Sequence, residues 1–430
     1  MNYTKSLSSL FVSALVFATA SHATVTAQGR TAVLKVPGDH PTISAAIAAA
    51  SPGDTVRVAG GTYRERVVID KAIKLQGAGR EKTIIDGESR TDLDSLGQVR
   101  VVAAGNVEMS GFTITRPGRP SAPGSYYVGI YPESPVAGVT YDIHHNRMIH
   151  VGDPNNLTGD ELGNGLVAGS GREHLDFHHN EISDTTYATI SGQTREGPLT
   201  IRDNELVVGF IGFTDCCYLI MGSITAPVRI LRNRIDMQTP QANFGYPTGI
   251  SVQGHGAGLV EIEGNTIYNI IEDRRGINLI GDAGGLQGGL IANNRILGAG
   301  GYTGITVWGP CEDVVVESNL ITGITGVNTP GSNGGIRLRV YPDPSIVGTP
   351  VRTRIIGNTI EALRGISVES DSRSNQIYGN RIRALGFPAV QLGEATSFNL
   401  VGNNVLRTPA QRGNAAVLDQ GTSNTVALNR

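Results

Sequence analysis

TGITVWGPCEDVVVESNLIT, residues 303–322, contains two short phrases that return along the chain. In the first phrase, TGITV, Ile and Val alternate with other residues, which is typical of a strand with one buried face. The second phrase, ESNLIT, is centred on an Asn. The first phrase returns as TGISV at 248, RGINL at 275, GGIRL at 334, RGISV at 364 and PAVQL at 388.

The Asn phrase occurs ten times, and its Asn stands at positions 146, 180, 204, 233, 265, 294, 319, 358, 380 and 403. The gaps cluster in the mid-twenties with some insertions, and such a period predicts a solenoid of stacked coils. Asn tolerates the left-handed backbone of a sharp corner, and identical Asn side chains on stacked coils can form a hydrogen-bonded ladder. Each coil is therefore expected to carry at least two strands and an Asn corner.

The bulk composition agrees with a β solenoid and excludes several partners. The chain has 57 Gly, 17% charged and 5% aromatic residues, which suits many short strands and turns. A net charge of −3 without a basic run argues against nucleic acid. Residues 1–23 have the polar start, the apolar run and the small residues of a signal peptide, so we expect a secreted or periplasmic protein without a membrane span. The sequence carries no indication of an oligomeric state.

These phrases resemble the right-handed parallel β-helix of the pectin-lyase-like superfamily over essentially the whole mature chain. Residues 41–87, which begin PTISAAIAAASPGDT, also resemble the opening of pectin methylesterases. The resemblance implies an all-β, single-stranded right-handed parallel β-helix (solenoid) over 53–430. An N-terminal strand and a short capping helix, at about Pro41 to Ala50, would precede it within 31–52.

Two shorter motifs resemble particular enzymes of that superfamily. GTYRERV at 61–67 is similar to the first methylesterase motif, but the later motifs that carry the catalytic carboxylates of that family do not follow. GHG at 254–256 is similar to a polygalacturonase motif, although the accompanying paired aspartates are missing.

The outward positions of the TGITV-type strand are the candidate site, because in the superfamily that the chain resembles this face is the polysaccharide groove. Trp stacks on sugar rings, and Arg offers a planar fork to carboxylates. The coil with two arginines is also the longest, and its inserts at 323–335 and 341–350 are expected to wall a cleft. The candidate catalytic residues are Arg337, Arg339, Glu369 and Asp371, and the candidate substrate-binding residues are Gln253, His255, Asn278, Asp282, Trp308 and Tyr341.

These outward residues, together with the expected signal peptide, predict an exported enzyme that acts on an acidic polysaccharide. The foremost prediction is a lyase that cleaves a uronate polymer by β-elimination. Elimination needs a base beside the carboxylate and positive charge to stabilise the intermediate, roles expected for Arg337 and Arg339. Three acids, Glu369, Asp371 and Asp282, are candidates for recruiting Ca²⁺.

Three alternatives stay open. A glycoside hydrolase could use Glu369 and Asp371, which would lie about 7 Å apart on one strand face. The protein could instead bind sugar or metal without catalysis. Finally, Arg339 and Glu369 could simply form a cross-strand ion pair on a solvated sheet.

The motifs DIHHN at 142–146 and DFHHN at 176–180 are expected to stack Asp142 on Asp176 and His144 on His178. Strands about 4.8 Å apart would let two imidazoles share zinc or copper. Equivalent positions elsewhere form an ordinary mixed surface, however, so we assign no metal site to them. Cys216, Cys217 and Cys311 are expected to be free, buried thiols, because the pair and Cys311 lie about three coils apart.

Overall fold

The computed structural model describes residues 31–87, 97–117, 126–152, 162–169, 171–185, 189–192, 196–207, 219–224, 226–237, 248–256, 260–271, 274–326, 333–386 and 388–430. The expected signal peptide, Cys216 and Cys217 lie outside these ranges. No helix within them has the length and hydropathy that crossing a bilayer requires. The unit Ala32–Arg430 is described below.

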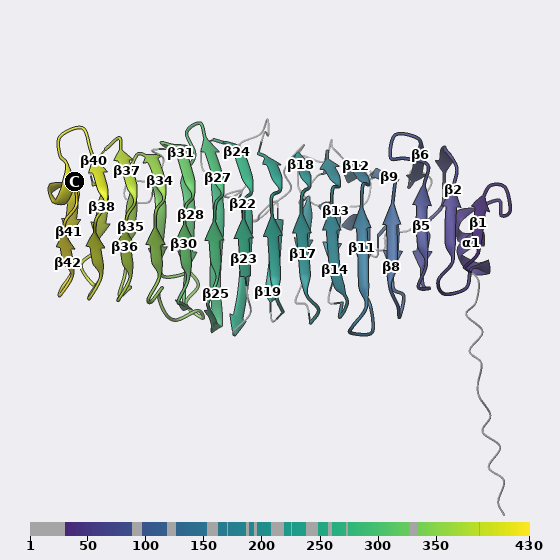
Figure 1. The fold of residues 1–430 in the computed structure, drawn as a ribbon, viewed down its shortest axis with the longest axis horizontal. Coiled ribbons are helices and arrows are strands. Elements are labelled where there is room, and N and C mark those ends of the chain that lie inside the picture. Colours follow the sequence, from purple (N-terminus) through teal and green to yellow (C-terminus); the bar gives the residue numbers. More distant parts are fainter. Residues whose placement is uncertain are drawn as a thin grey trace, which may run out of the picture. The chain divides into compact units, whose positions relative to one another are not determined.

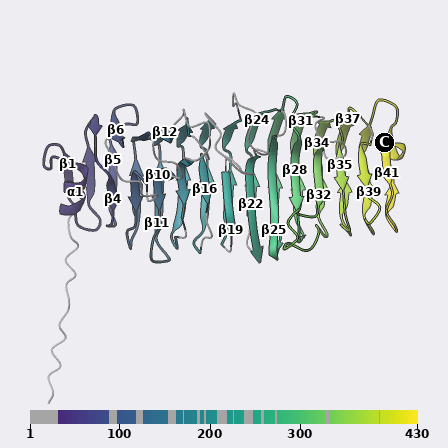
Figure 2. The same cartoon turned by 180° about the vertical axis from the view of Figure 1, so that it is seen from behind.

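Within the described residues, the strands of this unit form three parallel sheets, and each coil contributes to them in turn (Figure 1, Figure 2). Sheet A contains β1 (Val33–Val36), β2 (Thr55–Val58), β5 (Lys74–Gly77), β8 (Val107–Ser110), β11 (Thr140–His144), β14 (His174–His178), β17 (Leu199–Arg202), β20 (Val228–Leu231), β23 (Val260–Glu263), β26 (Leu290–Ala292), β30 (Val315–Glu317), β33 (Arg354–Ile356), β36 (Gln376–Tyr378), β39 (Leu400–Gly402) and β42 (Thr425–Ala427).

Sheet B contains β3 (Gly61–Tyr63), β6 (Thr83–Asp86), β9 (Thr113–Pro117), β12 (Arg147–Gly152), β15 (Glu181–Ser183), β18 (Glu205–Val207), β21 (Arg234–Asp236), β24 (Thr266–Ile270), β27 (Arg295–Gly298), β31 (Leu320–Ile324), β34 (Thr359–Ala362), β37 (Arg381–Ala384) and β40 (Val405–Arg407). Sheet C contains β4 (Val67–Ile69), β7 (Val99–Val101), β10 (Tyr126–Pro132), β13 (Leu162–Ala168), β16 (Ile190–Gly192), β19 (Leu219–Ile224), β22 (Thr248–Gly256), β25 (Arg275–Gln287), β28 (Thr303–Trp308), β29 (Cys311–Glu312), β32 (Gly334–Arg339), β35 (Ile366–Val368), β38 (Val390–Leu392) and β41 (Val417–Asp419). The all-β parallel β-helix that the repeats predicted is confirmed. A short 3₁₀ helix, η1 (Gly413–Ala416), lies in the last coil.

The first coil carries the short helix α1 (Ile43–Ala49), which buries Ile43 and Ile47 in the core. Glu65 accepts hydrogen bonds from the first helical N–H groups at 2.9 Å, where a carboxylate is favoured. The ammonium of Lys71 donates to carbonyls at the other end of the helix at 2.6–3.0 Å. Side chains of the first coil therefore fix both ends of α1.

An asparagine ladder runs along the coils, as the repeats predicted. In one rung, the backbone N–H of Asn265 donates to Oδ1 of Asn294 at 2.9 Å, and Nδ2 of Asn294 donates to the Ile262 carbonyl at 2.8 Å. The ladder residues are buried, so the amides satisfy backbone groups that water does not reach. They are Asn146, Asn180, Asn204, Asn233, Asn265, Asn294, Asn319, Asn358, Asn380 and Asn404, followed by the less buried Asn429.

Two details of the predicted Asn corner are wrong. The left-handed corner residue is the one before the ladder Asn, such as His145 (φ 55°) before Asn146. In the pair at 403 and 404, Asn403 (φ 53°) therefore takes the corner and Asn404 is the ladder residue. A ladder position requires an amide side chain that points inward. A corner position requires only a residue that tolerates the left-handed backbone, and His, Asp, Ser or Gly stands there in other coils.

The glycine of the TGITV-type phrase has a packing reason. A Cβ on Gly304 would lie 2.5 Å from the carbonyl oxygen of Gly335 and 2.6 Å from Cγ2 of Ile321, which projects from sheet B. The same crowding recurs at Gly276 and Gly365. Close approach of successive coils therefore selects glycine before the buried Ile of each strand.

Candidate active site on sheet C

The outward positions of sheet C form two rows, and the predicted alternation is confirmed. The first row aligns Ser251, Asn278, Thr306, Arg337, Ser367 and Gln391 on successive strands. The second row aligns Gln253, Ile280, Trp308 and Arg339. Four successive coils thus bring predicted site residues onto one face of the β-helix.

The first row is more closed than a solvated groove would be. Arg337 is only 2% exposed, and Asn278 and Thr306 are 4% and 1% exposed. Arg339 and Glu369 are each 25% exposed at the side chain. Solvent therefore reaches the site mainly through Arg339 and Glu369, while Arg337 lies beneath them.

Glu369 is bound between the two arginines. Oε1 of Glu369 accepts from Nε and Nη2 of Arg337 at 2.9 and 2.7 Å, and Oε2 accepts from Nη2 at 2.9 Å. Oε2 also lies 3.7 Å from Nε of Arg339. The cross-strand ion pair expected as an alternative is present, but its main partner is the buried Arg337. Both carboxylate oxygens are engaged, so Glu369 is a counter-ion to the arginines.

Trp308 forms the wall beside Arg339. It is 5% exposed, and the guanidinium carbons of Arg339 and Arg275 lie 4.8 and 5.5 Å from its ring centroid. Tyr341 packs edge-on at 5.6 Å, and the indole N–H faces Oδ1 of Asn278 at 3.4 Å. Trp308 therefore orients the arginines by cation–π contact, and its burial leaves little ring surface for stacking on a sugar.

Among the described residues of this cluster, Arg337 and Arg339 both lie against the single carboxylate of Glu369, and Arg275 lies against the ring of Trp308. Two guanidinium groups therefore share one carboxylate. Burial, with a smaller contribution from the charge of Arg337, holds the pKa of the Arg339 guanidinium below its usual range. The described residues offer no hydrogen-bond partner to the buried Nε of Arg339 or to Oγ1 of Thr306. Arg339 therefore keeps a buried N–H donor that none of the described residues accepts.

The expected Glu369–Asp371 pair does not share a strand face, because β35 ends at Val368 and the chain turns. Asp371 is exposed and lines a separate hollow of about 270 Å³ with Glu312 and Arg373. Asp282 is half-buried and accepts from the Gly284 N–H at 3.0 Å. The side chain of His255 lies outside the described residues.

The expected Ca²⁺ ligands do not fit that role. Glu369 is taken by the arginines, and the described part of the chain gathers neither Asp371 nor Asp282 into a group of three ligand side chains. One group of three does form, by Asp142, Asp176 and His178 on sheet A.

A basic hollow of about 720 Å³ on sheet B was not predicted from the sequence. Arg381, Arg383, Arg407 and Arg412 line it together with Glu361. Arg383 stacks in register on Arg407 of the next coil, so the repeat alignment held the signal. Arg383 pairs with Glu361 at 3.0 Å, and both side chains are largely exposed to water. We therefore interpret the hollow as a solvated surface.

Comparison with known proteins bears on the fold. Residues 248–430 match the family model described as the right handed beta helix region. No curated protein sequence is similar enough to this chain to register as a match. Similar solved structures include the A-module of a mannuronan C-5 epimerase from Azotobacter vinelandii, with 13% identity over 87% of this chain and 90% of that chain, at a TM-score of 0.34.

Two further solved structures are also similar. A pectin methylesterase from carrot has 16% identity over 77% of this chain and 83% of that chain, with a TM-score of 0.34. An alginate lyase has 11% identity over 92% and 99% of the two chains, with a TM-score of 0.22. The three parallel sheets show that the chain folds as a parallel β-helix, and its residues 248–430 match the right handed beta helix family.

Proposed function

We propose that this chain is an exported enzyme that cleaves a uronate-containing polysaccharide by β-elimination. The observation that carries the proposal is Arg339, a partly exposed arginine held over Trp308 in a cluster where two guanidinium groups share one carboxylate. A uronate carboxylate is the anion that a sugar chain would bring to this cluster, and the planar guanidinium matches its two oxygens.

Elimination removes the proton on the carbon beside that carboxylate, forms a carbon–carbon double bond and breaks the bond from the neighbouring carbon to the glycosidic oxygen. That oxygen takes a proton from water and leaves as a hydroxyl group. Arg339 is the group in this cluster that can reach the substrate and take the proton. A guanidinium ordinarily holds its proton too firmly for this role, since its pKa exceeds about 12. The lowered pKa of Arg339 makes the neutral form more accessible, which supports the assignment.

Arg337 and Glu369 act as positioning residues in this scheme. Arg337 is buried beneath Arg339, and its charge favours the negative intermediate across the low-dielectric interior. Glu369 accepts hydrogen bonds from Arg337 and lies 3.7 Å from Nε of Arg339, so it holds both side chains in place. No step is assigned to Ca²⁺, because the acids expected to bind it are engaged or apart.

Hydrolysis by Glu369 is the less favoured alternative, since both its carboxylate oxygens accept from Arg337. A hydrolase needs one carboxyl to donate a proton and a second to activate water. Neither role suits a carboxylate that neutralises a buried arginine.

The test is incubation of the purified mature protein with pectate, alginate and glucuronan, each followed by the ultraviolet band of unsaturated uronate and by a reducing-end assay. We expect the band with at least one polymer, and its loss by at least ~100-fold in Arg339→Ala. Arg354→Ala, an exposed position of sheet A, is the matched control and should keep full activity. Activity retained in Arg339→Ala would refute the assignment. Export is tested by the mass of the protein recovered outside the cytoplasm.

A further inference from the structure

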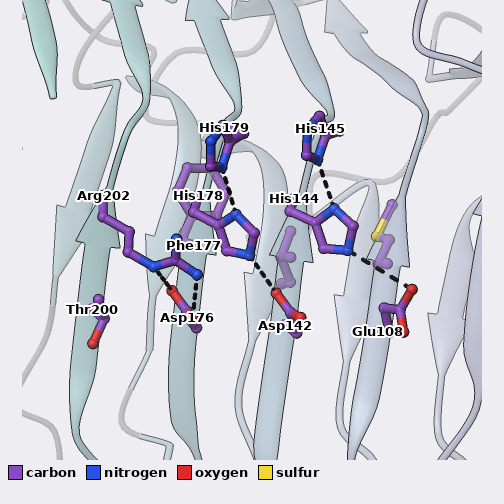
Figure 3. A network of polar contacts seen from close by, with 12 residues as sticks. Glu108, Asp142, His144, His145, Asp176, Phe177, His178, His179, Thr200 and Arg202 are labelled. Atoms are coloured by element: carbon purple, nitrogen blue, oxygen red, sulfur yellow. Dashed lines mark hydrogen bonds and ion pairs between the residues drawn. The ribbon is translucent and has the colours of Figure 1, made fainter. Parts of the chain in front are cut away.

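Four histidines gather where β11 and β14 of sheet A end (Figure 3). His144 stacks on His178 of the next coil, with ring centroids 4.9 Å apart and planes within 9°. The corner residues that follow, His145 and His179, stack at 5.0 Å and 3°. The predicted stacking of His144 on His178 is thus confirmed, and a second column of imidazoles lies beside it.

Within each coil the two imidazoles face each other through the same atom. Nδ1 of His144 lies 2.8 Å from Nδ1 of His145, and Nδ1 of His178 lies 2.8 Å from Nδ1 of His179. Two ring nitrogens at this distance must share a single proton, because two protons would clash and two lone pairs would repel. Each pair therefore places two nitrogens around one positively charged atom.

The same distance suits a metal ion in place of the proton. Two nitrogens that each lie about 2.0–2.1 Å from a shared ion and 2.8 Å from each other subtend roughly 85–90° at that ion. This angle is that of neighbouring positions in a square-planar or tetragonal site, which Cu²⁺ and Ni²⁺ prefer, and is narrower than the tetrahedral angle of zinc. The pairs lie too far apart, by their stacking distances, to share one ion.

The far side of one ring already has the partner that metal-binding histidines use. Nε2 of His178 lies 2.8 Å from Oδ1 of Asp142, so a proton on Nε2 leaves the Nδ1 lone pair turned toward His179. Nε2 of His144 faces Glu108 more loosely, at 3.8 Å.

Direct ligation by Asp142, Asp176 and His178 is the competing arrangement, since these side chains also lie close together. Arg202 opposes it, because its guanidinium binds both oxygens of Asp176 at 3.0 and 2.8 Å. The guanidinium beside Asp176 would repel a metal ion bound to the same carboxylate. In addition, Nε2 of His178 is already in contact with Asp142. The Nδ1 atom of His178 takes no part in the contact with Asp142 and lies against Nδ1 of His179 instead.

We propose that each histidine pair, His144 with His145 and His178 with His179, chelates one divalent first-row transition-metal ion through its two Nδ1 atoms. The exposed corner rings give access from a hollow of about 430 Å³, lined also by Arg80, Glu181, Asp203 and Glu205. Water fills the remaining coordination positions. The site is independent of the activity proposed for sheet C.

The experiment titrates the full mature protein, freed of metal, with Cu²⁺ and follows binding by calorimetry and electron paramagnetic resonance. We expect two equivalents with nitrogen hyperfine structure, and dipolar broadening from two ions about one coil apart. His179→Asn should lose one equivalent, and His145→Asn with His179→Asn should lose both. Asn suits these positions because both have left-handed backbones, at φ 54° and 55°, as Asn403 does at its own corner.

His150→Asn is the matched control, because His150 has the same left-handed backbone (φ 51°) but lies outside both pairs. It should keep two equivalents. The urea unfolding of each variant is compared with that of the wild type. A variant that unfolds like the wild type but binds less copper has lost the metal site and not the fold. The proposal is overturned if the double variant still binds two equivalents, if His150→Asn loses as much as His179→Asn, or if the wild type binds one equivalent that either single variant abolishes.

Discussion

Glu369→Gln removes the charge that neutralises Arg337, which is only 2% exposed and makes three contacts of 2.7–2.9 Å with that carboxylate. Breaking a buried ion pair by deleting one partner costs about 3–5 kcal/mol, because the remaining charge is left unpaired in the interior. Glu369 is 25% exposed, which places the expected loss near the lower limit, at about 3 kcal/mol.

Removing both charges should be much milder than removing one. Arg337→Met combined with Glu369→Leu replaces the pair by apolar side chains, so the free energy of unfolding should return to within about 1 kcal/mol of the wild type. Glu361→Gln is the control, since its pair with Arg383 is largely exposed and should change stability by less than about 0.5 kcal/mol.

The assay is urea unfolding followed by the fluorescence of Trp308, the only tryptophan of the chain, which packs beside Arg339. The reasoning fails if Glu369→Gln unfolds at the wild-type urea concentration. It fails equally if the double variant is as unstable as the single one, because the carboxylate would then contribute by packing rather than by charge.

Further predictions concern the scaffold. Asn294→Ala should lower the free energy of unfolding by roughly 2–6 kcal/mol, because the Asn265 N–H and a carbonyl of the preceding coil lose buried partners worth about 1–3 kcal/mol each. The neighbouring exposed Arg295→Ala should change it by less than about 0.5 kcal/mol in the same urea titration, and equal effects would contradict the ladder. Gly304→Ala should lower the free energy of unfolding by about 1–3 kcal/mol, because the new Cβ would lie 2.5 Å from the carbonyl oxygen of Gly335. An unchanged urea midpoint would show that the two coils can move apart at no cost. Burial raises the pKa of the Cys311 thiol to about 12, so peptide mapping should find it unalkylated by iodoacetamide at pH 8 until urea is added; native labelling would show the thiol accessible.

The fold was predictable from the sequence because two short phrases repeat with the coils. Alternation within TGITV and GGIRL was enough to place Thr306 and Arg337 in register. The glycine of these phrases has a cause that one sequence cannot reveal, since the clash that excludes a side chain comes from an isoleucine of another sheet. The identity of the ladder Asn at 403 and 404 was ambiguous, because both corner and ladder accept asparagine.

The candidate site was predictable only as a set of positions. The alternation predicts which side chains point away from the core, but it does not predict which residues cover them. The burial of Arg337 and Trp308 was therefore not expected. The end of β35 at Val368 separates Glu369 from Asp371, and strand ends depend on local turns that periodicity does not register. The Nδ1 pairs depend on ring orientation, which the motif DFHHN does not specify.

The most direct test of the account is mass spectrometry of the products that wild type and Arg339→Ala release from defined oligouronates. β-Elimination by Arg339 predicts fragments lighter by one water at the new non-reducing end than hydrolysis would give, and predicts that the variant releases almost none. Fragments that carry the full water of hydrolysis, or unchanged release by Arg339→Ala, would contradict elimination at this cluster.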